Sequence, residues 1–298
     1  MKATFKLGLM FIATLSVSAC DSLDLTSDKG VFYYSNPTTK NITFKVDGDS
    51  HEILPGGKGN IKISSGMHKL ENSAGQVFSF MVFDNNNGGI INPDNHVYYT
   101  LSEAYAVEGK SNKFKPATYD VTINGHELEM SARSANATII DANMFKCSYQ
   151  LGEPFPDSIT THDRNSDGNI QSKCFDKIEL IDYISTIYKE DLKPVSPKDE
   201  GNDSINMTFN YDIPTVKFLH ADMQEKADAI VVLLKQLKES DDAGIHEDIS
   251  KKITQLSIDL VTVYAKHTST LSKEEHQKYD DFIRHSGYLQ TYGVWVNN

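Results

Sequence analysis

The amino-acid sequence predicts an α+β protein, with an N-terminal antiparallel β-sandwich followed by a C-terminal helical region. In the first half, apolar and polar residues alternate, as in Ile42–Val46, and turn residues recur at short intervals. The clearest hairpin joins residues 119–123 to residues 126–130 through Asn124-Gly125, a pair that favours a type I′ turn. In the second half, apolar residues recur at the three-to-four-residue spacing of amphipathic helices.

The strands of the first half are short, and turn residues such as Asp47-Gly48 and Gly56-Gly57 separate them. Residues 77–83 are apolar except for Ser79, so we expect a central strand that packs on both faces. The strands predicted before the hairpin comprise residues 31–34, 42–46, 52–54, 61–63, 68–71, 77–83, 90–91 and 97–99.

The helical spacing begins at residues 178–188, and a polar linker over residues 195–207 follows Pro194. Two amphipathic stripes come next, and a third helix begins at Ser272 with capping-box spacing and ends at Gly287. We expect these stripes to be buried within their own domain, and a groove for a partner helix is the alternative. The stripes are Phe218, Met223, Ala227, Ile230, Leu234 and Leu237, then Ile249, Ile253, Leu256, Leu260 and Val263.

The first twenty residues have the pattern of a bacterial export signal. Lys2 and Lys6 precede an apolar run over residues 7–15, which is shorter than the roughly 20 residues that span a bilayer. The residues that follow, Val17-Ser18-Ala19-Cys20, resemble the lipobox of bacterial lipoproteins. This resemblance implies cleavage before Cys20, diacylation of its thiol and acylation of the new amino terminus, which anchors the protein in the membrane. An ordinary secretory peptide is the alternative.

The residue after Cys20 indicates where the protein is located, and the net charge restricts its partners. Asp21 resembles the signal that retains enterobacterial lipoproteins in the inner membrane, so we expect an anchor there that faces the periplasm, with the outer membrane or cell surface as alternatives. The whole chain has a formal charge of −12, and loss of residues 1–19 leaves 27 basic against 41 acidic residues, or −14. Such acidity argues against nucleic-acid partners.

The length of 298 residues suggests about two folded domains after the signal peptide. We predict a signal peptide at 1–19, a lipidated tether at 20–29, the β-sandwich at 30–145, a connector with one helix and the polar linker at 146–214, and the helical domain at 215–298. Within the β-sandwich, the segments Val46-Asp47-Gly48, Pro55-Gly56-Gly57 and Gly66-Met67-His68-Lys69-Leu70 resemble small PEGA-type modules of bacterial surfaces. That resemblance implies a binding or spacing role without catalytic residues.

After lipidation of Cys20, Cys147 and Cys174 are the remaining cysteines of a chain exported to an oxidising compartment. We therefore predict a disulfide between them. Two separately buried thiols are the alternative.

Residues 163–171 have the spacing of a calcium-binding loop, with oxygen-bearing side chains at alternate positions and Gly168 for the tight turn. The loop resembles a single EF-hand or dockerin-type repeat, which implies a structural calcium ion. It departs from both families at its twelfth position, where Cys174 replaces an acidic ligand. A surface turn held by the disulfide is therefore favoured, and no cofactor is required. The candidate ligands are Asp163, Asn165, Asp167 and Asn169.

Other signs of chemistry are weaker. His276 with Asp280, and Asp281 with His285, have helical spacing for a metal, although charged helices commonly carry such pairs. Clustered tyrosines in the β region, including Tyr98 and Tyr99, suggest a surface that stacks on carbohydrate or peptide. The sequence has no nucleophile-elbow, phosphate-loop or zinc-protease motif. We therefore expect a non-enzymatic binding or accessory protein of the envelope, with a protein or glycan partner; a glycan hydrolase with unidentified carboxylates is the alternative.

Overall fold

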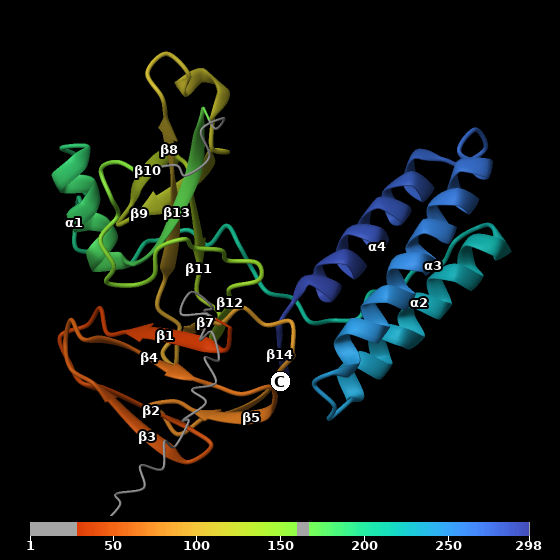
Figure 1. The fold of residues 1–298 in the computed structure, drawn as a ribbon, viewed down its shortest axis with the longest axis horizontal. Coiled ribbons are helices and arrows are strands. Elements are labelled where there is room, and N and C mark those ends of the chain that lie inside the picture. The colour runs from red at the N-terminus through yellow and green to blue at the C-terminus, as the bar shows by residue number, and fades with distance from the viewer. Residues whose placement is uncertain (1–28, 160–166, 298) are drawn as a thin grey trace, which may run out of the picture.

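The computed structural model describes residues 29–159 and 167–297, and the chain has an α+β fold with most of its helix at the C-terminal end (Figure 1). Figure 1 shows three parts: two sheets at one end, a second β region with one helix at the other end, and three long helices beside them.

The first part contains two sheets whose buried side chains form one apolar cluster. Phe32 from one sheet packs in this cluster with Phe44 and Phe80 from the other. One sheet has the order β12-β7-β1-β4, formed by β12 (Ile139–Asp141), β7 (Gly89–Ile91), β1 (Val31–Ser35) and β4 (Lys58–Lys62). The other has the order β14-β6-β5-β2-β3, formed by β14 (Val294–Asn297), β6 (Val77–Val82), β5 (Gly66–Glu71), β2 (Ile42–Val46) and β3 (Asp49–Ile53).

The sheets differ from the predicted antiparallel arrangement in one pair, because β1 and β7 run parallel. The chain visits the other sheet between these two strands, and it returns to β7 in the same direction. The two-faced strand predicted at residues 77–83 is confirmed. Phe80 and Val82 pack between the sheets, whereas Met81 and Phe83 pack in the cluster formed by the C-terminal helices.

The second β region is built around the long strand β8 (Tyr98–Ala106), which lies between β11 (Ala132–Ala135) and β13 (Gly168–Asp176). A short 3-10 turn, η1 (Ser111–Lys113), follows β8. The predicted hairpin is present as β9 (Tyr119–Ile123) and β10 (His126–Met130). Asn124 and Gly125 both have positive φ, as a type I′ turn requires. Strand β13 and the extension of β8 beyond Tyr99 were not predicted.

Helix α1 (Lys177–Ile187) packs on this second β region, where Leu180 and Ile184 join the buried side chains of β8, β9 and β13. The other helices are α2 (Ala221–Glu239), α3 (Ile245–His267) and α4 (Lys273–Thr291). Their predicted apolar stripes meet in one cluster, and Ser272 caps α4 by accepting a hydrogen bond from the Glu275 N–H. This confirms the predicted apolar stripes. The predicted end of the third helix at Gly287 is wrong, because α4 continues to Thr291 and buries Leu289 in the same cluster.

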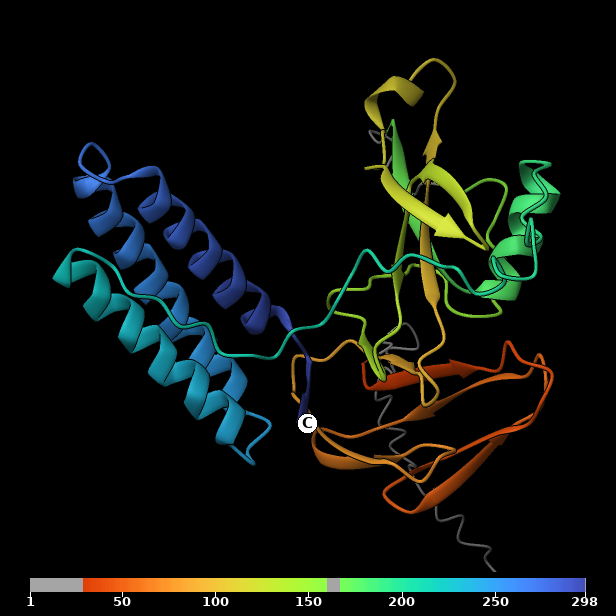
Figure 2. The same cartoon turned by 180° about the vertical axis from the view of Figure 1, so that it is seen from behind.

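The predicted polar linker is bound along much of its length to the second β region, as Figure 2 shows for the segment between α1 and α2. The Gly125 N–H donates to the Asn202 carbonyl, and the Met207 N–H donates to the Ser134 carbonyl. The Ser204 side chain accepts from the Thr122 N–H at 2.7 Å. The segment that was predicted as a polar linker therefore forms hydrogen bonds to the edges of β9 and β11.

Candidate functional site

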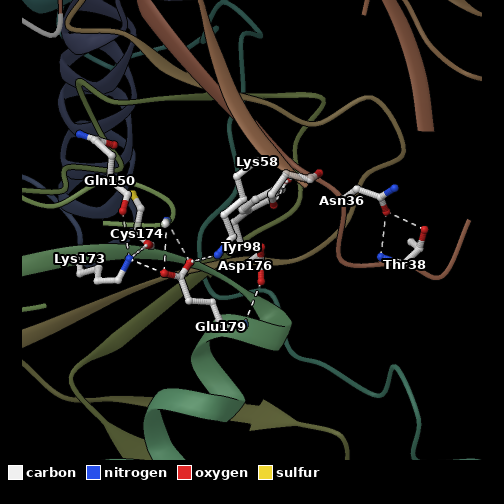
Figure 3. A network of polar contacts seen from close by, with 11 residues as sticks. Asn36, Thr38, Lys58, Tyr98, Gln150, Lys173, Cys174, Asp176 and Glu179 are labelled. Atoms are coloured by element: carbon white, nitrogen blue, oxygen red, sulfur yellow. Dashed lines mark hydrogen bonds and ion pairs between the residues drawn. The ribbon is translucent and has the colours of Figure 1, made fainter. Parts of the chain in front are cut away.

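A buried ionic network holds the N-terminal end of α1 against both β regions (Figure 3). Lys173 in β13 is 2% exposed, and its ammonium lies 2.8 Å from one Glu179 oxygen and donates to the Gln150 carbonyl at 3.0 Å. Lys58 in β4 lies 2.9 Å from the other Glu179 oxygen. Burial lowers the pKa of Lys173, and the carboxylate of Glu179 opposes this shift. The network therefore ties α1 to β4 and β13 at once.

Two further contacts fix the same helix end. The Asp176 carboxylate accepts a hydrogen bond from the Glu179 N–H at 2.9 Å, which caps α1. Cys147 and Cys174 are joined by a disulfide, with their Cα atoms 5.5 Å apart, and this is the pairing that the sequence analysis predicted. The disulfide attaches the chain before β13 to the strand that leads directly into α1.

The other end of α1 forms one wall of a cleft of about 420 Å³, which we name the α1 cleft. Its remaining walls come from β8, from β10 and from the segment that precedes β9. The floor is apolar, and the rim is polar and acidic. The floor side chains are Leu101, Leu128, Met130 and Ile184, and the rim side chains are Glu103, Thr118, Glu129, Tyr188 and Glu190.

The local sequence brings Glu190 to this cleft through the way α1 ends. The Tyr188 N–H donates to the Ile184 carbonyl, and Lys189 then adopts a left-handed conformation with φ of 61°. A left-handed residue after the last helical turn reverses the chain direction. The Lys189 ammonium donates to the Thr186 carbonyl at 2.6 Å, so it neutralises the carbonyl end of the helix.

The charges that line the α1 cleft are all negative within the described part of the chain. Glu103 accepts a hydrogen bond from the Tyr188 phenol, and Glu129 accepts one from the Thr118 hydroxyl at 2.9 Å. None of the three glutamates forms an ion pair with another described residue. Burial raises the pKa of Tyr188, and the hydrogen bond to Glu103 adds to this rise. The site therefore presents hydrogen-bond acceptors and negative charge above an apolar floor.

The residues predicted from the sequence as a calcium site are only partly described. Asp163 and Asn165 lie outside the described residues, as do Cys20 and Asp21. The Asp167 carboxylate forms an ion pair with Lys113, which lowers the pKa of Asp167. The Asn169 side chain accepts from the Ile170 N–H at 2.8 Å, and Asn169 pairs with Tyr105 in the ladder of β13 and β8.

The helical zinc candidates have other partners. The His276 ring lies 2.6 Å from the Tyr264 hydroxyl, and Asp281 pairs with Arg284. Across residues 29–159 and 167–297, no group of three or more His, Cys, Asp or Glu side chains is placed to hold a metal ion. Tyr98 and Tyr99 are fully buried, so these two rings do not form a stacking surface.

Sequence reasoning missed the glutamates of the α1 cleft. Glu103 lies beyond the strand predicted at residues 97–99, Glu129 lies on an alternating hairpin, and Glu190 lies past a helix end. No local spacing relates three such distant residues, so the topology alone brings them together. None of the helices within the described ranges is long and apolar enough to cross a membrane. Comparison of the chain with protein-family models, curated proteins and solved structures gives no match.

Proposed function

We propose that this chain is a lipid-anchored protein of the bacterial cell envelope that binds a ligand or partner in the α1 cleft and catalyses no reaction. The anchor is Cys20, and Asp21 directs the protein to the inner membrane, where it faces the periplasm. In this proposal the two sheets of β1 to β7, completed by β12 and β14, form a β-sandwich scaffold, which their shared apolar cluster supports.

The observation that carries the binding function is the α1 cleft itself. Ligand sites are commonly concave, with an apolar lining and a few polar groups that converge on one point. The α1 cleft has such an apolar lining, to which Leu101 and Ile184 contribute, and carboxylates that form no ion pair with another described residue stand at its rim. The disulfide and the Lys173 network hold α1 in place, so the cleft is formed before a ligand arrives.

Photo-crosslinking in intact cells tests this function. A benzophenone amino acid replaces Glu190 at the rim in one variant and Val195, which is 74% exposed and lies outside the cleft, in a matched variant. We expect one discrete adduct from position 190 and none of that mass from position 195. Equal adducts at both positions, or no adduct at position 190, would contradict a binding role for the cleft.

A second candidate function is hydrolysis of a cell-wall or surface glycan, and the presence of Glu103 and Glu129 in one cleft favours it. The test is release of reducing ends from purified peptidoglycan by the wild-type protein and by the Glu103→Gln and Glu129→Gln variants. Turnover that both substitutions abolish would replace the binding proposal with an enzymatic one.

A further inference from the structure

The acidic residues of the α1 cleft differ from those around the other end of the same helix in having no basic partner among the described residues. Near the start of α1, Glu179 pairs with Lys58 and Lys173, and Asp203 pairs with Lys177 at 2.7 Å. At the cleft, by contrast, three glutamates gather without any Lys, Arg or His among the described lining residues. Within the described part of the chain, this lining offers negative charge to a cationic ligand.

The hydroxyl groups on the rim already donate hydrogen bonds to the glutamates of the cleft. Thr118 already donates to Glu129, and Tyr188 already donates to Glu103. The carboxylate oxygens keep further lone pairs, because each carboxylate accepts about four hydrogen bonds in total. A ligand that binds at this rim must therefore donate hydrogen bonds.

Three lysines are close to cleft residues in the sequence. Lys189 lies between two rim residues, yet its ammonium donates to the Thr186 carbonyl. Lys113, on the loop that follows β8, pairs with Asp167. Lys115 directly precedes Pro116, which lines the cleft, but Lys115 itself does not. Among the described residues, therefore, no basic side chain lines the cleft.

The floor restricts which cations fit. Leu128 and Met130 are half-buried and give the floor most of its apolar surface, and they pack against the core that contains Leu101 and Ile184, each 2% exposed. A hydrated divalent metal prefers a shell of oxygen ligands and gains nothing from such a floor. An alkyl chain that ends in an ammonium group can lie along the apolar side chains while its charge reaches the carboxylates.

We propose that the α1 cleft binds an aliphatic amine, with the alkyl chain on the floor formed by Leu101, Leu128, Met130 and Ile184 and the ammonium group at Glu103, Glu129 and Glu190. This inference rests on the proposed binding function and names its ligand class. The same chemistry is present in a free diamine and in a lysine side chain of a polypeptide.

Isothermal titration of the full lipidated protein in nonionic detergent tests the proposal. The probes are hexamethylenediamine, the neutral isostere hexanediol, and N-acetyl-lysine amide, which represents a lysine within a polypeptide. We compare the wild type with Glu103→Gln/Glu129→Gln and with Glu108→Gln/Glu127→Gln. The second pair removes the same charge from glutamates that do not line the cleft.

We expect at least one amine to bind the wild type and hexanediol not to bind. The cleft variant should weaken amine binding by roughly tenfold or more, while the control variant changes it by less than about twofold. Binding of the diamine alone identifies a free amine as the source, and tighter binding of the lysine amide identifies a polypeptide.

Equal weakening in both variants would show a general charge effect and overturn the proposal, as would the absence of amine binding. If hexanediol binds and the cleft variant changes its affinity, the proposal that the ligand is an amine would also be overturned. The cleft would remain a ligand site. The crosslinking variant keeps Glu103 and Glu129, and the crosslink does not depend on the ligand class, so its failure separately identifies a failure of the binding function.

Discussion

At the residue scale, the buried ammonium of Lys173 depends on Glu179 more than Glu179 depends on it. In Glu179→Gln, the Lys173 side chain, which is 3% exposed, keeps only carbonyl acceptors for its ammonium. This substitution should lower the free energy of unfolding by about 3 kcal/mol. Lys173→Met leaves Glu179 paired with Lys58, so its cost should be smaller, about 1 kcal/mol.

Urea unfolding of the two variants at pH 7 measures this difference. Lys251→Met is the control, because Lys251 forms an exposed pair with Glu247 and should leave stability unchanged. A larger loss in Lys173→Met than in Glu179→Gln would contradict the account.

Asp141 is a second residue whose environment makes a testable difference. Its carboxyl group is fully buried and accepts hydrogen bonds from the backbone N–H groups of Asn143, Gly293 and Val294. Burial raises the pKa of Asp141 to about 7 from its ordinary value of 3.8, although the three N–H groups oppose this rise. Between pH 3.8 and about pH 7, therefore, Asp141 is protonated in the folded state and ionised in the unfolded state.

Stability should accordingly fall as the pH rises from about 4 to about 7 and should then level off, with a loss on the order of 4 kcal/mol from a shift of about three pKa units. Asp141→Asn removes the titrating group, so the difference in unfolding free energy between wild type and variant should change between about pH 4 and about pH 7. Parallel pH profiles for the two proteins would show that Asp141 does not titrate in this range.

At the scale of elements, the Cys147–Cys174 disulfide attaches β13 and the start of α1 to the preceding loop. It closes a loop with a sequence separation of 27, so its reduction should cost about 3 kcal/mol on the chain-entropy model. Chemical unfolding with and without a reductant measures this cost. The Cys147→Ala/Cys174→Ala variant should be insensitive to the reductant, and a wild type that is equally insensitive would contradict the prediction.

Strand β14 joins the C-terminal end of the chain to β6, and Trp295 is its largest buried side chain. Trp295 is 1% exposed, and its ring contacts Phe83 edge-to-face with a centroid separation of 6.1 Å. Trp295→Ala should therefore lower the free energy of unfolding by about 3 to 5 kcal/mol.

Thermal and urea unfolding of Trp295→Ala provide the test. The control is Val77→Ala at the exposed end of β6, beyond the residues that pair with β14, and it should change stability little. Similar losses of unfolding free energy in the two variants would show that β14 does not hold the C-terminal helices to the sheet that contains β6.

At the scale of the whole molecule, the sequence predicts the elements that depend on near neighbours. The alternation at residues 42–46, the Asn124-Gly125 turn and the helical stripes each act over a few residues, and the structure contains all of them. The pairing partner of a strand, by contrast, depends on residues far away in the sequence. The polar segment Gly168–Asp176 is a strand because it pairs with β8, and Val294–Asn297 is a strand because it pairs with β6.

The α1 cleft could not be predicted for the same reason. Its glutamates come from β8, β10 and the end of α1, and each has the ordinary features of an acidic surface residue in its own segment. The disulfide was predictable because the expected export and an even number of remaining cysteines favour it without knowledge of the fold. The proposed anchor at Cys20 likewise rests on a short local pattern.

The measurement that tests the central claim most directly is native mass spectrometry of the protein extracted from its own membrane in nonionic detergent. The account predicts a chain that begins at Cys20 and carries acyl groups, with a bound ligand mass that disappears in Glu103→Gln/Glu129→Gln. An unacylated chain, or a bound mass that is the same in the wild type and this variant, would contradict a lipid-anchored protein that binds its ligand in the α1 cleft.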